Sequence, residues 1–329
     1  MKHLRQKGLT IDEVAHALGI SKTTVSRALS GKGRVSEETR ARVRSFIAQG
    51  GHGTSPEQRR TNTVSVVIPP RLVDVGVPFT YLCLLGIASA AKQRDYDVLL
   101  CNADENDLSA LENQLQRRKS DGAILVRTLT TADPCLELIR RYGLPCVALG
   151  RLGHGDVLQV DNDNLGAAKE MTRLLLRMGM KRIACLYDYA NSTANFDRLR
   201  GFTQAMEEAG EPVDKGLIYP GLVTEAQRVD ALEDALARKA ECLLCCDDTL
   251  ALYMSVLMRQ RGIDCPAGLR LASLYDSEFL QQAAITAVRF DTAALGATAC
   301  GYLVDAISGK AEGTPQVQPF QIILRESTK

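Results

Sequence analysis

From Val64 onward, the chain alternates short apolar runs with longer amphipathic segments. The apolar runs predict strands, which lie at 63–69, 97–102, 122–126, 145–150, 182–188, 241–246, 269–275 and 285–290. Segments with apolar residues at helical spacing predict helices, which lie at 80–94, 109–118, 164–179, 198–210, 229–239 and 249–262. Continuous apolar strands separated by helices are typical of parallel sheets covered on both faces, so the pattern predicts an α/β fold.

The length of this α/β segment bears on its organisation. Residues 64–329 form a stretch longer than one such sheet commonly needs, so we expect two lobes with parallel sheets. Open α/β sheets bind ligands at the carboxyl ends of their strands. Two lobes would therefore create a cleft there for a small molecule.

The first 48 residues follow a different pattern, with three short helical segments. Each segment comes directly after a hydroxyl residue that can cap a helix, and these residues are Thr10, Ser21 and Ser36. A turn of about three residues that begins at Gly19 separates the first two segments. Two short helices joined by a tight glycine turn predict a helix-turn-helix.

Charge is unevenly distributed along the chain. Residues 1–60 carry twelve Lys/Arg and five Asp/Glu, a net charge of +7, whereas the remainder has a net charge of −6. A basic head on an acidic body indicates a polyanionic partner for the head. The polar face of the second helix suits phosphates and base edges, and it presents Lys22, Thr23, Ser26 and Arg27. The alternative is a solvated helix in a small bundle.

A family resemblance makes the DNA interpretation specific. The segment LTIDEVAHALGISKTTVSRALSGKGRVSEETRARV resembles the DNA-binding headpiece of the lactose-repressor (LacI/GalR) family of bacterial transcription regulators, and ISKTTVSR matches its recognition helix. The resemblance implies that Lys22, Thr23 and Arg27 contact bases. It also implies that phosphates are held by a set of hydroxyl residues, namely Thr10, Ser21, Thr24, Ser36 and Thr39. A homodimer on a near-palindromic operator is the expected assembly.

Residues 49–63 are rich in Gly, Ser, Pro and charge, and they predict an exposed linker between domains 1–48 and 64–329. The family usually has a longer segment here, with a hinge helix whose leucine wedges into the minor groove. This chain lacks about five residues of that segment and has no leucine in it. We therefore expect less operator bending, with Arg59 and Arg60 left to reach phosphates or the minor groove.

The body resembles the effector domain of the same family, which shares its fold with periplasmic sugar-binding proteins. The stretches that carry this resemblance are VDNDNLGAAKEMTRLLLRMGMKRIACL, RLRGFTQAM, CCDDTLAL, SLYDSE and VPFTYL. The chain departs from the family pattern at Val77 and Asp247, where asparagine is usual, and at Met180, where histidine is usual. The resemblance implies that a small-molecule effector binds between the lobes.

The candidate effector residues form a saccharide-like set. Arg198 can clamp vicinal hydroxyls or a carboxylate, Asp248 and Asp276 accept hydrogen bonds, and Phe79 offers a flat apolar face. A sugar or sugar phosphate is favoured, since Arg151, which stands where some sugar-responsive relatives have an acid, suits an anionic ligand; a purine or nucleoside is the alternative. Two simpler roles remain open: Asp248 could cap the helix that starts at Thr249, and Asp161 could cap the next helix after it in the sequence.

Several function classes are disfavoured. The ten cysteines predict reduced thiols, and the run ECLLCC lacks a second cysteine pair or histidine cluster for zinc. We expect no metal, cofactor or catalytic residue, and hence no enzyme. The chain also shows neither a membrane-spanning run nor a secretion signal, so a cytoplasmic location is expected. A ligand-responsive regulator, as a repressor, fits best, and a cytosolic sugar- or nucleoside-binding sensor is the alternative.

Overall fold

The structure is a computed structural model of the chain. It describes residues 10–31, 33, 35–48, 60–70, 78–126, 129, 131–153, 157–189, 191–310 and 316–329. The chain divides into two compact units, residues 1–60 and residues 61–329. Most of the expected linker, 49–59 with Arg59, lies outside the described residues, as does Val77.

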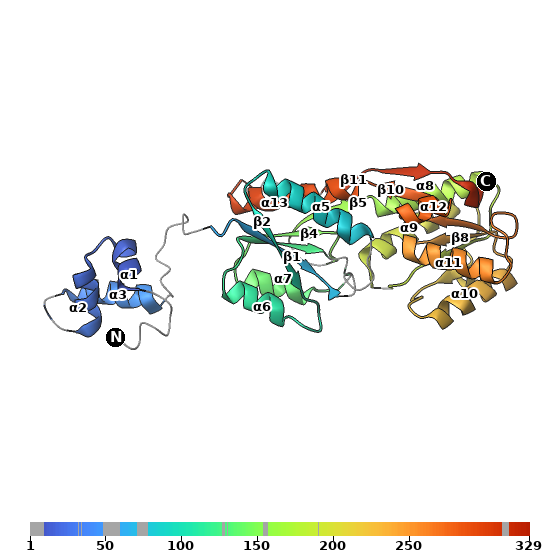
Figure 1. Ribbon diagram of the computed structural model, residues 1–329. Helices are drawn as coiled ribbons and strands as arrows, with labels where there is room; N and C mark the ends of the chain where they lie inside the picture. The colour runs from blue at the N-terminus through green and yellow to red at the C-terminus, as the bar shows by residue number, and fades with distance from the viewer. Residues whose placement is uncertain are drawn as a thin grey trace. The chain divides into compact units, whose positions relative to one another are not determined.

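Unit 1 holds the helix-turn-helix. Its described helices are α1 (Ile11–Leu18), α2 (Lys22–Ser30) and α3 (Glu37–Ala48), drawn in blue in Figure 1. All three contribute to a small core, which is formed by Val14, Ala15, Val25, Ala28, Val43 and Phe46. Gly19 ends α1 in the left-handed conformation, with φ at 63°, which glycine adopts without strain. The predicted all-α headpiece is confirmed.

Unit 2 begins with a lobe built on a parallel sheet. Its strands are β1 (Thr63–Ile68), β2 (Asp97–Asn102), β3 (Gly122–Val126), β4 (Cys146–Leu149), β5 (Leu158–Asn162) and β11 (Gln316–Gln318), in the spatial order β11-β5-β4-β3-β1-β2. One face is covered by α5 (Pro78–Lys92) and α13 (Thr292–Ile307), and the other by α6 (Ser109–Gln116) and α7 (Pro134–Arg141) (Figure 1). Central strands are thus buried on both faces, as their apolar runs predicted.

The second lobe repeats this arrangement. Its strands are β6 (Ile183–Leu186), β7 (Ile218–Tyr219), β8 (Cys242–Cys245), β9 (Arg270–Ser273), β10 (Thr286–Phe290) and β12 (Phe320–Ile323), in the order β12-β10-β9-β8-β6-β7. One face is covered by α8 (Asn164–Arg177) and α9 (Thr193–Glu208), and the other by α10 (Glu225–Ala237) and α11 (Asp248–Gln260). The short helix α12 (Glu278–Gln282) follows β9. Only β12 runs antiparallel to its neighbour within this described sheet.

The two lobes are interwoven by the path of the chain. It passes from one lobe to the other at 162–164, 290–292 and 318–320. In the first lobe α13 packs closely on α5. The approach is so close that a Cβ atom added at Gly86 would clash with the carbonyl oxygen of Ala293. The first lobe is therefore completed by residues near the end of the chain.

The two-lobed α/β prediction is confirmed, and the predicted strands all occur, most of them with slightly shifted ends. The elements that the sequence analysis did not predict are β5, β7, β11, β12, α7, α12 and α13. Helix α9 begins at Thr193, five residues before the predicted start at Arg198, because Ser192 caps it. This earlier start matters, since the added turn borders the cavity described next.

Candidate ligand cavity and nucleic-acid interface

A cavity of about 260 Å³ lies in unit 2 where the two lobes meet. The carboxyl ends of strands from both sheets border it, through Val126, Leu149 and Asn162 in the first lobe and Asp188, Asp247 and Tyr275 in the second. Open α/β sheets bind ligands at such strand ends. Of the residues predicted to bind an effector, the structure brings Phe79, Arg198 and Asp248 to this wall.

Arg198 is fixed in the cavity wall by buried neighbours. Its side chain is only 9% exposed. Its Nε donates to Oδ1 of Asn164 at 3.0 Å, and its Nη1 donates to the carbonyl oxygen of Cys246 at 2.8 Å and to Oδ1 of Asn195 at 3.5 Å. Nη2 forms no hydrogen bond with any of the described residues. The guanidinium is thus held in place with one nitrogen left to donate to a ligand.

Two adjacent acids at the start of α11 have different roles. Asp247 caps the helix, because its Oδ1 accepts from the backbone N–H of Leu250 at 2.7 Å. Asp248 is therefore not the cap, and it lies 4% exposed at the cavity wall. Burial raises the pKa of Asp248, and burial followed by the charge of Asp188 raises the pKa of Asp247 to about 7. The Oδ2 atom of Asp247 is buried without a hydrogen-bond partner among the described residues.

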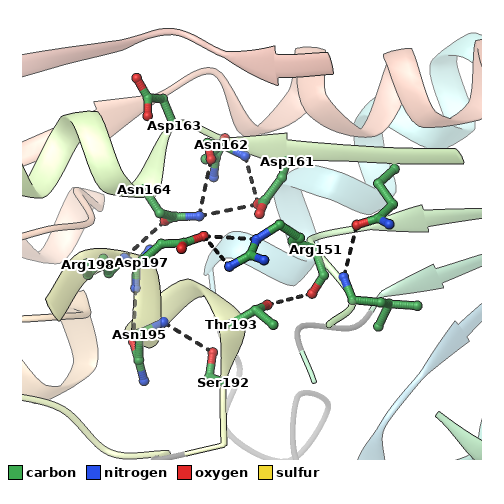
Figure 2. A network of polar contacts seen from close by, with 12 residues as sticks. Arg151, Asp161, Asn162, Asp163, Asn164, Ser192, Thr193, Asn195, Asp197 and Arg198 are labelled. Carbon is green, nitrogen blue, oxygen red and sulfur yellow. Dashed lines mark hydrogen bonds and ion pairs between the residues drawn. The ribbon is translucent and has the colours of Figure 1, made fainter. Parts of the chain in front are cut away.

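The N-cap of α8 is also not the residue suggested by the sequence, which was Asp161. Asp163 caps this helix through the N–H of Gly166 at 2.8 Å. Asp161 instead faces the cavity, where it accepts from the backbone N–H of Asn162 at 2.8 Å and from Nδ2 of Asn164 at 3.3 Å (Figure 2). Burial raises the pKa of Asp161 to about 6. The simpler capping roles are thus taken by Asp163 and Asp247.

Aromatic side chains provide the apolar part of the wall. Phe79 of α5 and Tyr275, which follows β9, meet edge to face with ring centroids 5.8 Å apart. Because these residues belong to different lobes, the contact also closes one side of the cavity. Tyr189 lines the cavity as well and is 37% exposed. Flat aromatic faces of this kind suit the apolar face of a sugar ring.

Arg151 and Asp276 are not brought to the cavity wall. Arg151 donates from Nε and Nη2 to Oδ2 of Asp197, at 3.0 and 2.7 Å. Asp276 has a side chain that is 2% exposed, and it is paired with Arg289 at 2.7 Å and with Arg325 at 2.8 Å. Both charges are therefore already compensated by protein groups. Nothing in the local sequence marks these partners, which lie 46 residues from Arg151 and 13 and 49 residues from Asp276.

The polar face of α2 is open to solvent. Lys22, Thr23, Ser26 and Arg27 are exposed, while Val25 on the opposite face is fully buried. Lys22 forms an ion pair with Asp12 of α1 at 2.6 Å, but both side chains stay more than 60% exposed. A surface pair of this kind is weak and can open for another partner. The side chains expected to contact bases are thus free to do so.

The hydroxyl residues predicted to hold phosphates act as helix caps in unit 1. Thr10 accepts from the N–H of Glu13 at 3.2 Å, Ser21 from the N–H of Thr24 at 3.1 Å, and Ser36 from the N–H of Thr39 at 3.2 Å. The hydroxyls of Thr24 and Thr39 bond back to their capping serines at 2.8 Å. Caps and phosphate contacts are compatible, because a hydroxyl oxygen that accepts from a backbone N–H still carries an O–H that can donate to a phosphate.

Comparison with known families assigns both units. Residues 10–53 match the family described as "Bacterial regulatory proteins, lacI family", and residues 172–328 match "Periplasmic binding protein-like domain". The chain is 28% identical over 338 residues to the HTH-type transcriptional regulator CelR of Thermobifida fusca, covering 98% of this chain and 99% of that protein. It is 24% identical to the HTH-type transcriptional repressor PurR of Haemophilus influenzae (strain PittEE), covering 97% and 98%.

A solved structure agrees over the same length. The complex described as "transcriptional regulator CelR-cellobiose complex" superposes with a TM-score of 0.75 at 28% identity, covering 97% of this chain and 99% of that chain. The chain belongs to the lacI family of bacterial regulatory proteins. As a lacI-family member it is a ligand-responsive, DNA-binding transcriptional regulator.

Several cavity residues of this lacI-family regulator escaped sequence analysis. Asp188 follows β6, and its Oδ1 accepts from Nδ2 of Asn195 at 3.2 Å. Arg228 of α10 also reaches the wall, held by the carbonyl oxygen of Leu222 at 3.0 Å. An acid at the end of a predicted strand is a usable signal for Asp188. Nothing in the local sequence marks Asn195 or Arg228, which depend on tertiary packing.

The cysteine run of the regulator lies where it was expected. Cys242, Cys245 and Cys246 are fully buried in or directly after β8, and burial raises the pKa of the Cys242 thiol above its usual range. These thiols pack as small apolar groups. Among the described helices, none is both long enough and apolar enough to cross a membrane.

Proposed function

We propose that this regulator is a repressor that binds a near-palindromic operator as a homodimer and is controlled by a neutral saccharide in the cavity of unit 2. The observation that carries the ligand assignment is the composition of the cavity wall, which combines a fixed arginine, several carboxylates and flat aromatic rings. It acts by binding rather than by catalysis. Because bacterial DNA lies in the cytoplasm, a DNA-binding regulator of this kind acts there.

The balance of donors and acceptors favours a sugar. Arg198 has Nη2 left to donate, while Oδ2 of Asp247 and Oδ1 of Asn162 are buried acceptors without partners among the described residues. Buried polar atoms without partners cost free energy, so a ligand that donates to them gains affinity. Sugar hydroxyls both donate and accept. The complex of the similar CelR contains cellobiose, which supports a saccharide here.

The charge of the wall favours a neutral sugar over a phosphorylated one. Four carboxylates line the cavity, namely those of Asp161, Asp188, Asp247 and Asp248, and none of them forms an ion pair with another described residue. The two arginines of the wall, Arg198 and Arg228, already donate to protein oxygens. A phosphate would therefore meet more negative than positive charge. Arg151, the anion clamp suggested by the sequence, is engaged by Asp197.

The DNA contacts follow from the exposed face of unit 1. We assign base contacts to Lys22, Thr23, Ser26 and Arg27 on α2, since their side chains are exposed beside a buried Val25. Phosphate contacts fall to the capping region, that is to Thr10, Ser21, Thr24, Ser36 and Thr39. The name of the similar PurR, a transcriptional repressor, supports repression as the mode of action.

Dimer formation is supported by an apolar surface on the first lobe. Tyr81, Leu82 and Leu85 of α5 are 63%, 38% and 48% exposed, although they are large and apolar. Exposed apolar clusters of this kind mark protein interfaces. A two-fold dimer would present two copies of α2 to the two halves of a palindrome.

The test begins with selection of DNA from a random library by the purified full-length protein, at moderate salt and without ligand. A gapped palindrome is expected, and enrichment of a single unrepeated half-site would contradict the dimer. Release of the selected operator is then measured with cellobiose, glucose, glucose 6-phosphate and guanine. A neutral sugar should release the DNA. If only the phosphate or the purine does so, the ligand class is wrong.

A further inference from the structure

The strongest unexplained feature of unit 2 is the ion pair that joins the lobes beside the cavity. Arg151 follows β4 of the first lobe, whereas Asp197 lies on α9 of the second. We propose that Arg151 and Asp197 form a clasp that positions the first turns of α9 and thereby assembles the ligand cavity. This inference rests on the proposed function only in taking that cavity as the ligand site.

The clasp has more than one contact. Arg151 donates to Oδ2 of Asp197 through both Nε and Nη2, and its own carbonyl oxygen accepts from the hydroxyl of Thr193. Both Thr193 and Asp197 belong to α9, so one residue of the first lobe forms hydrogen bonds with two successive turns of the same helix. A bridge between Leu129 and Ser192 joins the lobes at the beginning of that helix. Figure 2 shows Arg151 between Thr193 and Asp161.

The spacing along α9 links this grip to the ligand wall. Ser192, Asn195 and Arg198 follow one another at intervals of three residues, and all three line the cavity. Thr193 and Asp197 are four residues apart and contact Arg151. Residues three or four apart share a helix face, so the two sets lie on adjacent faces. A shift of α9 that broke the clasp would therefore also move Arg198 and Asn195.

The burial of the pair is suited to a reversible contact. The Arg151 side chain is 41% exposed, while that of Asp197 is 14% exposed. Asp197 is thus partly desolvated and depends on its partner, whereas Arg151 can return to water when the lobes part. A pair of this exposure contributes modestly and is weakened by salt. Such a contact biases the arrangement of the lobes without locking it.

The test measures lobe separation directly and needs no ligand. Spin labels are attached to Asn113→Cys on α6 and Ala226→Cys on α10, exposed positions on different lobes, in a full-length Cys265→Ser background, since Cys265 is the exposed cysteine of the described chain. Arg151→Gln and Asp197→Asn should each add a population with a longer label distance. The charge-swapped double variant Arg151→Asp with Asp197→Arg should restore the parental distribution. Unchanged distances in both single variants would overturn the clasp.

The matched control is an ion pair that lies within one lobe, at the carboxyl end of α10. Arg238 pairs with Asp234 of α10 at 2.6 Å, and the two side chains are 43% and 45% exposed. Arg238→Gln removes the same charge as Arg151→Gln and should leave the label distances unchanged. If it lengthens them equally, loss of charge rather than loss of the clasp is responsible, and the proposal fails.

A second readout connects the clasp to binding. The affinity for cellobiose, or for whichever sugar releases the operator, should fall roughly two- to fivefold in Arg151→Gln and recover in the charge-swapped variant. Added salt should weaken binding by the parental protein more than binding by Arg151→Gln. An unchanged affinity, together with lengthened label distances, would show that the clasp does not assemble the cavity. If no sugar binds even the parental protein, the proposed function fails while the distance measurement still decides the clasp.

Discussion

The two polar surfaces of this regulator are built in opposite ways. On unit 1, the side chains of Lys22 and Arg27 stand in water on a single short helix. In the cavity of unit 2, Asn162 and Asp248 are 7% and 4% exposed, and the wall is collected from the ends of many strands. The first surface recognises its partner largely through charge in water, so it should respond to salt. The second relies on desolvated hydrogen bonds, so it should respond to geometry and to pH.

The largest expected effect comes from the fixed arginine of the cavity. Arg198→Lys keeps the positive charge but loses the fork that bonds Asn164 and Cys246. Sugar affinity should fall about a hundredfold by calorimetry, because the buried oxygens of Asn164 and Cys246 would lose their donors and the ligand would lose Nη2. Operator affinity without ligand should stay within about twofold. The exposed Arg200 on the same helix supplies the control Arg200→Lys, and an equal loss there would remove the distinction.

The next effect separates base recognition from charge on unit 1. Arg27→Ala should weaken binding to the selected operator roughly ten- to a hundredfold, as expected for loss of a base contact. Arg44→Ala, at an exposed position on α3, removes the same charge. It should cost far less on the operator, and both variants should bind random DNA alike in fluorescence anisotropy. Equal losses on the operator would mean that Arg27 contributes only charge.

A third prediction concerns pH and is specific to the cavity. A sugar hydroxyl that donates to Asp247 favours its charged form, so sugar binding should release a proton near the pKa of about 7. Sugar affinity should therefore fall roughly three- to tenfold as pH is lowered from 8 to 6. Asp247→Asn keeps a residue that can cap α11 and should flatten this dependence. Calorimetry in buffers of different ionisation enthalpy checks the proton release, and a pH profile that is unchanged by the substitution would contradict it.

The raised pKa of Asp247 makes the stability of the ligand-free protein depend on pH in the opposite direction to its sugar affinity. Asp247 ionises at pH 3.8 when unperturbed and at about 7 in the folded chain, so the folded state binds the proton more tightly. Its contribution to the free energy of unfolding should grow as pH falls through 7, and it is fully present only below 3.8. Without ligand, the melting temperature of unit 2 should therefore rise slightly from pH 8 to pH 6, and less so in Asp247→Asn.

The smallest expected effect concerns Thr10, which caps α1 and is also proposed to contact phosphate. Thr10 completes a capping box with Glu13. Thr10→Ala should destabilise α1 by about 1 kcal/mol, whereas Thr10→Ser keeps the cap. Hydrogen exchange of the α1 amides in the full chain measures this difference. Equal exchange in the two variants would show that the cap contributes little to the helix.

The parts of this molecule that could be predicted are those specified locally. Strand β3 is an uninterrupted apolar run, and α2 begins after a serine cap. Strand β5 was missed because its sequence, LQVDN, ends in the polar residues Asp161 and Asn162 that face the cavity. The polar residues that line the cavity thus interrupt the apolar run by which a buried strand is predicted.

The cavity shows the same limit. Sequence motifs predicted that Arg198 and Asp248 bind the effector, and both lie at the cavity wall. A motif also predicted that Asp276 binds the effector, but its charge is compensated by Arg325, 49 residues further along the chain. Such a partner is brought in by the packing of β12 on β10, which no local pattern reports. Which acid remains free for a ligand is therefore a property of the tertiary structure.

The packing of α13 on α5 has a consequence for how this protein is made. The two helices lie about two hundred residues apart in sequence, yet they cover the same face of the first sheet. During synthesis the headpiece leaves the ribosome before the body, and its described core is formed by residues close in sequence, so it can fold early. The first lobe must wait until nearly the whole chain has been released. A nascent regulator would thus fold its DNA-contacting headpiece before the cavity between its two lobes is complete.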